Sequence, residues 1–152
     1  MKSHDDVLQQ IVRIAQSGRD FFVQMYPRVT DPEERTAFTY ISEVKSQLLT
    51  DLAPWVPTIA QNPVGCVDQP SVEHASPAAI IEKMYAEARK HFRGEAPGAN
   101  ALRFGEEQLI RLVERAFEES SVPALKEILK SYYGQLVICR EAMWRLQLRL
   151  AA

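Results

Sequence analysis

Two charged residues of this 152-residue chain lie at positions where the hydrophobic pattern predicts a core. Lys45 stands in a helical series of apolar residues, and Glu106 lies between Leu102 and Leu109 in another. Burial of either charge alone would be strongly unfavourable. The two side chains therefore either pair with each other in the interior or extend along the rim of the fold so that their charged ends reach water. The pattern allows both arrangements.

Histidine offers a second kind of chemistry. The chain has three histidines, at positions 4, 74 and 91, and we expect each of them to lie at the surface. The segment His91-Phe92-Arg93-Gly94 also loosely resembles the phosphorelay histidine-phosphotransfer modules, which are helical bundles with an exposed histidine beside a basic residue. That resemblance implies His91 as phosphoryl acceptor and Arg93 as the cation that balances the phosphoryl charge, in place of a lysine.

The hydrophobic spacing predicts helices and no strands. The longest apolar seam follows the last helix, with a spacing of three and four residues that is typical of a helix packed in an antiparallel bundle. No Glu, Asp or His interrupts this seam, so it offers no metal ligand to a bundle interior, and Cys139 on it is expected to be an inert thiol. The seam consists of Leu125, Leu129, Tyr132, Leu136, Cys139, Met143, Leu146 and Leu150.

Prolines and capping residues mark the ends of the helices. Ser3, Ser76 and Asn100 are predicted N-caps, and Thr30 with Glu33 forms a predicted capping box. The first two helices should form one hairpin and the last two a second, with a short extra helix between them. We predict helices over residues 4–26, 31–53, 77–93, 101–120 and 123–150, and a proline-rich crossover over residues 54–76.

Composition limits the class of protein. The 46% hydrophobic and 25% charged residues are typical of a soluble globular protein, and the length suits a single domain over residues 1–152. A net charge of −2 lacks the basic face of nucleic-acid-binding proteins, so we expect no nucleic-acid partner. No apolar stretch approaches the about 20 residues needed to span a bilayer. Two cysteines and no apolar signal segment point to the cytoplasm.

Several segments resemble the ferritin-like four-helix bundles, and in particular a bacterial branch related to the rubrerythrins. The resemblance covers most of the chain and implies an all-α antiparallel four-helix bundle of two hairpins joined by a long crossover. It rests on Gln16-Ser17-Gly18-Arg19-Asp20-Phe21-Phe22, the turn at Asp31-Pro32, the crossover, Phe104-Gly105-Glu106-Glu107 and Pro123-Ala124-Leu125-Lys126.

The chain departs from the metal-binding pattern of that family. Di-iron members take a Glu from each of two helices and a Glu-x-x-His from each of the other two. Here Arg19 stands where the family would place a Glu, Glu43 is followed three residues later by Ser46, and Glu141 by Trp144. We therefore expect no metal and no cofactor, and a non-enzymatic bundle that acts through a protein partner or as a homodimer. The alternatives are a di-iron or metal-storage protein and a phosphotransfer module that uses His91.

Overall fold

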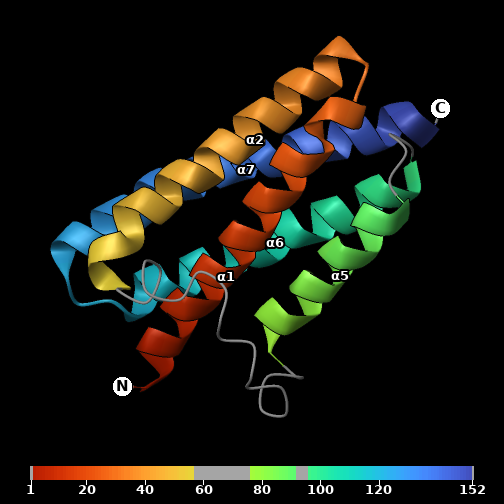
Figure 1. Ribbon diagram of the computed structural model, residues 1–152. Coiled ribbons are helices and arrows are strands. Elements are labelled where there is room, and N and C mark those ends of the chain that lie inside the picture. Colours follow the sequence, from red (N-terminus) through yellow and green to blue (C-terminus); the bar gives the residue numbers. More distant parts are fainter. Residues whose placement is uncertain (1, 57–75, 92–95, 152) are drawn as a thin grey trace.

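The computed structural model describes residues 2–56, 76–91 and 96–151, and these residues form α-helices and short 3₁₀ turns without any strand (Figure 1). The predicted all-α class is confirmed over these ranges. No helix within them has both the length and the apolar character that crossing a membrane requires. The elements are α1 (Lys2–Met25), η1 (Tyr26–Arg28), α2 (Pro32–Leu52), η2 (Ala53–Trp55), α5 (Pro77–His91), α6 (Ala96–Glu119) and α7 (Pro123–Ala151).

Four long helices form a ring around the core. The hairpin of α1 and α2 packs against the hairpin of α6 and α7, because α1 contacts α6 and α2 contacts α7. Neighbouring helices of the ring run in opposite directions, and α2 and α6 run in the same direction (Figure 1). The short helix α5 lies outside the ring against α1 and α6, and it runs alongside α1 in the same direction.

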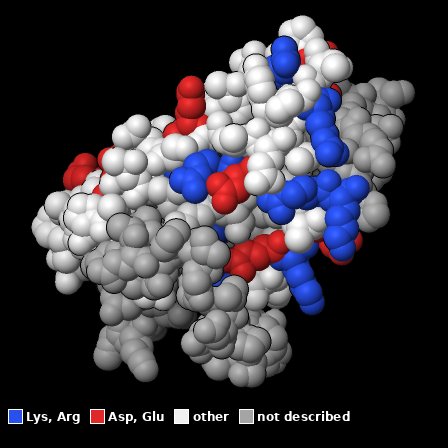
Figure 2. Space-filling view, viewed as in Figure 1, with Lys and Arg blue, Asp and Glu red and all other residues white. Residues whose placement is uncertain are grey.

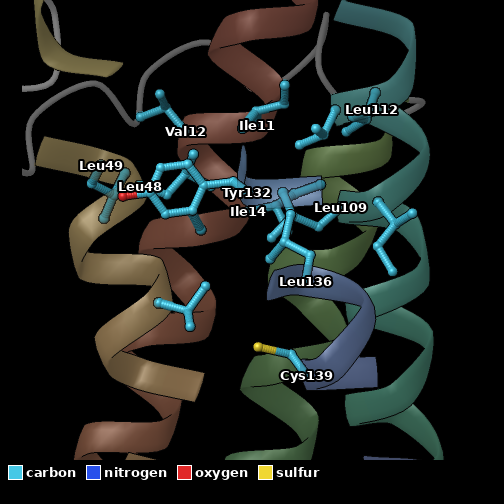
Figure 3. Packing of buried hydrophobic residues seen from close by; sticks show 14 of the residues in the cluster. Ile11, Val12, Ile14, Leu48, Leu49, Leu109, Leu112, Tyr132, Leu136 and Cys139 are labelled. Carbon is cyan, nitrogen blue, oxygen red and sulfur yellow. The ribbon is translucent and has the colours of Figure 1, made fainter. Parts of the chain in front are cut away.

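The core contains the apolar faces that the spacing predicts. On α7, the six seam residues from Leu125 to Met143 are all buried, and Leu136 and Cys139 have no exposed surface. Side chains from α1, α2, α6 and α7 meet around Leu136 in the interior (Figure 3). Ile80 of α5 is an exception, because this apolar side chain in a predicted helix is 46% exposed. The spacing of apolar residues along each long helix therefore determines which face of that helix is buried.

Some predicted helix ends are wrong. The prediction starts the fourth helix at residue 101 with Asn100 as its cap, but α6 already begins at Ala96. Pro97 lies in the first turn of α6, where the backbone N–H groups have no partner within the helix, so proline is tolerated there. The structure also places Ser3 inside α1 rather than at its N-cap.

The caps of α2 and α5 show which side chains stabilise the helix starts. Asp31, not Thr30, is the N-cap of α2, since its carboxylate accepts a 3.0 Å hydrogen bond from the Glu34 N–H. Its side chain satisfies one of the free N–H groups of the first turn. At α5 the predicted cap is confirmed, because the Ser76 hydroxyl accepts from the Ala79 N–H at 3.1 Å.

Candidate functional site

Lys45 of α2 and Glu106 of α6 form an ion pair in the interior of the bundle. The Lys45 Nζ donates to Glu106 Oε1 at 2.7 Å and to Oε2 at 2.9 Å. Both side chains have no exposed surface. The alternative in which the two charged ends reach water at the rim is therefore wrong, and the paired arrangement is the one that the fold contains.

A glycine of α1 makes room for this pair. A Cβ at Gly18 of α1 would lie 2.6 Å from the Lys45 Cε, which is closer than carbon atoms approach without displacement. The ring of Phe22, also on α1, lies 5.8 Å from the Lys45 Nζ and faces the ammonium group with its π electrons. Gly18 therefore lets the lysine stem pass close to the backbone of α1.

Tyr85 of α5 adds a third polar group to the centre. Its side chain is buried, and its hydroxyl has no hydrogen-bond partner among the described residues. The hydroxyl lies within 3.0 Å of the position that a Cβ would take at Gly18 and 2.8 Å from that at Gly105. Burial raises the pKa of Tyr85 well above its usual value, and the negative charge of Glu106 raises it further.

Cys139 of α7 completes the group of side chains around the pair. Its sulfur points from α7 into the space between the helices (Figure 3). Burial raises the pKa of the Cys139 thiol to about 12, and the nearby Lys45 charge offsets only part of this effect. Since the thiolate is the reactive form of cysteine, a thiol that stays protonated at neutral pH is a poor nucleophile.

The residues at this centre do not fit a metal ion. Glu106 is the one carboxylate of the pair, and its oxygens accept hydrogen bonds from an ammonium group that has no lone pair to offer a metal. Glu43 and Glu141 are exposed on their helices. Among the described residues, no three His, Cys, Asp or Glu side chains lie close enough together to hold a metal ion.

The other residues singled out from the sequence lie elsewhere. Arg19 is about one-third exposed and pairs with the adjacent Asp20 at 3.1 Å, so it does not enter the core. His91 is the last residue of α5, and the position of its side chain is not among the described features. Arg93 and His74 lie outside the described residues.

Sequence reasoning missed the role of Tyr85. The spacing marks it as one more residue on the apolar face of the short helix. Gly18 and Gly105, inside predicted helices, were the available signal, because a glycine within a helix often marks the close approach of another group.

Comparisons with protein-family models, with curated proteins and with solved structures found no match to this chain. The functional interpretation therefore starts from the site itself. That site is a fully buried ion pair beside a tyrosine hydroxyl that has no hydrogen-bond partner among the described residues.

Proposed function

We propose that this chain is a ferritin-like four-helix bundle in which an ion pair takes the place of the metal centre. We further propose that it is a non-enzymatic protein that acts through contacts with a protein partner or with a second copy of itself. The observation that carries the proposal is the 2.7 Å contact between Lys45 and Glu106, both without exposed surface.

The arrangement of the helices supports the ferritin-like part of the proposal. Ferritin-like bundles consist of two antiparallel hairpins joined by one long crossover, and their metal ligands project inward from the facing helices. Here α1 with α2 and α6 with α7 form the two hairpins. Lys45 and Glu106 project inward from α2 and α6, the last helix of the first hairpin and the first helix of the second.

The chemistry of the pair supports a structural role. A buried lysine ammonium that donates to both oxygens of a carboxylate leaves neither group free to act as an acid, a base or a ligand. Pairing offsets the cost of removing both charges from water, and a pair of this kind can favour one arrangement of the helices over others. The centre of the bundle therefore holds helices together.

Large apolar side chains on the outer surface support a role in protein contacts. On α7, Ile138 is 52% exposed, Trp144 is 42% exposed and Tyr133 is 38% exposed. The guanidinium of Arg103 lies 4.4 Å from the centre of the Trp144 ring. Aromatic and arginine side chains of this kind are enriched at protein interfaces, where they supply much of the binding energy.

The metal part of the proposal is tested by elemental analysis of protein purified without chelators and without an affinity metal. We expect no stoichiometric iron, manganese or zinc. About two metal ions per chain, as in di-iron bundles, that are lost in Glu106→Gln but kept in the matched variant Glu107→Gln would overturn the proposal. The neighbouring residue Glu107 is a matched control because it is partly exposed, whereas the ion-pair partner of Lys45 is Glu106.

Sedimentation equilibrium over a range of concentrations tests contact with a second copy. We expect the chain to associate, and Ile138→Ser or Trp144→Ser to weaken association by about tenfold or more, as the loss of an interface aromatic or large aliphatic residue does. Glu127→Ser, an exposed change on the same helix, serves as the control. A monomer at every concentration would refute self-association.

A further inference from the structure

Polar contacts between described residues of α5 and α1 join this helix to the bundle. The Ala78 N–H, at the start of α5, donates to the buried Gln10 side chain at 2.8 Å. One turn further along, the Arg13 guanidinium binds both carboxylate oxygens of Glu82, at 2.9 and 2.7 Å. Both sides of this ion pair are about one-third exposed, so its contribution is small.

Four of the described side chains of α5 are buried in the core. Its core-facing residues are Ala78, Ile81, Tyr85 and Ala88. Its opposite face carries exposed charged residues, and Figure 2 shows Lys and Arg side chains gathered on this side of the molecule with acidic groups between them. The ring of α1, α2, α6 and α7 closes through its own contacts.

The Tyr85 hydroxyl opposes the docking of α5. It is buried without a hydrogen-bond partner among the described residues, whereas water would satisfy it once α5 moved away. A buried polar group in this state loses the hydrogen bonds that it makes in water, and it thereby weakens docking. The undocked state of α5 should for this reason lie closer in free energy to the native state than the globally unfolded state does.

Tyr85 also shields the Lys45 side of the ion pair. The end of its side chain and the Lys45 Cε both lie within 3.0 Å of the one Cβ position at Gly18. Neither Gly18 nor Gly105 has a side chain that could shield the lysine in place of the tyrosine. Removal of Tyr85 therefore takes away the side chain that packs beside Lys45 at Gly18.

We propose that α5 is a latch that undocks from α1 and α6 while the four-helix ring stays folded, and that this local opening exposes the Lys45 amine and the Glu106 carboxylate. The latch turns a closed ion pair into a site that solutes reach only in the open state. This inference goes beyond the proposed function, because it concerns access to the pair and does not depend on what the ferritin-like bundle binds.

The test is the acetylation rate of Lys45 by a water-soluble N-hydroxysuccinimide ester of acetic acid, followed by peptide mass spectrometry at increasing low concentrations of urea. Local opening exposes little surface, so we expect the Lys45 rate to rise only weakly with urea, whereas global unfolding has a steep dependence. Lys130, exposed on α7, reports the intrinsic reactivity of the reagent. A Lys45 rate that follows global unfolding at every urea concentration would overturn the latch.

Two variants of α5 should shift the equilibrium between its docked and undocked states in opposite directions. Tyr85→Phe removes the unpartnered hydroxyl, so it should slow Lys45 acetylation by about 5- to 150-fold. Glu82→Gln weakens the contact with Arg13, so it should speed acetylation by up to about fivefold. Lys83→Gln, an exposed change on the same helix, should leave the rate unchanged.

Amide hydrogen exchange of the wild-type chain provides an independent readout. We expect the amides of α5 to exchange through an opening of lower free energy than the amides of α7, and Tyr85→Phe to slow exchange in α5 selectively. Equal protection of α5 and α7, with equal urea dependence, would refute the latch even if the reagent reached Lys45 by another path.

Discussion

Replacing Lys45 with methionine removes the cation that binds the Glu106 carboxylate, and it changes the packing little. The ammonium lies 2.7 Å from the carboxylate, and neither side chain has any exposed surface. Methionine has nearly the length of the lysine stem and adapts to irregular space. The remaining carboxylate must therefore draw water into the core or take up a proton.

Proton uptake sets an upper limit on the cost. Neutralising a glutamate side chain at pH 7 costs about 1.36 kcal/mol for each pH unit above its ordinary value of about 4.3, or about 4 kcal/mol. The reverse change, Glu106→Leu, leaves Lys45 unpaired, and neutralising a lysine at pH 7 costs about 5 kcal/mol on the same scale. Both limits agree with the about 3–5 kcal/mol lost when one partner of a buried pair is removed.

The assay is urea unfolding of the wild type, both single variants and the double variant, which together form a double-mutant cycle. We expect the double variant Lys45→Met with Glu106→Leu to regain most of the lost stability, because apolar packing replaces the pair. Additive effects below about 1 kcal/mol would refute the buried pair. Lys130→Met on the exposed face of α7 is the control.

Three further predictions test the packing around the pair. Leu136→Ala should lower the unfolding free energy by about 2–5 kcal/mol, because loss of this fully buried side chain leaves a cavity. The control Arg145→Ala changes an exposed residue of the same helix and should cost less than about 0.5 kcal/mol. Equal urea midpoints for the two variants would contradict the assigned buried face of α7. Gly105→Ala should lower the thermal midpoint, because the new Cβ would lie 2.8 Å from the Tyr85 hydroxyl of α5. Gly134→Ala on α7 is the control, since its Cβ would meet nothing within 4 Å, and it should stabilise the helix by up to about 1 kcal/mol. A stabilising effect of Gly105→Ala would show that the space beside Gly105 is open. For Cys139, the unfolded thiol ionises from pH 9.0 and the buried one only near about 12, so its contribution to stability is complete below pH 9.0 and is lost as the pH rises. Under reducing conditions, the stability difference between wild type and Cys139→Ala should therefore shrink by about 2 kcal/mol between pH 9 and pH 11, and a constant difference would show that the thiol is solvated.

The helices and their buried faces follow from local features of the sequence. The spacing of Leu125, Leu129 and their successors places them on one side of α7 whatever the rest of the chain does, and all six described residues of that seam are buried. Proline likewise marks the starts of α2 and α7 because it is compatible only with the first turn of a helix. The start of α6 could not be found in this way, because Pro97 and Gly98 are typical of turns yet are also tolerated in a first helical turn.

The candidate site depends on how separate helices are placed relative to one another. The pattern marks Lys45 and Glu106 as core positions, but they are 61 residues apart, and their meeting depends on the rotation and axial offset of α2 against α6. Those quantities result from the packing of whole helix faces, which no local spacing encodes. Tyr85 shows the same limit, since only the docking of α5 between Gly18 and Gly105 brings its hydroxyl to the pair. The sequence alone thus determines the buried face of the last helix, because that face follows from the periodicity within one helix. The tertiary structure decides which of the buried charges become partners, because pairing requires the relative position of several helices.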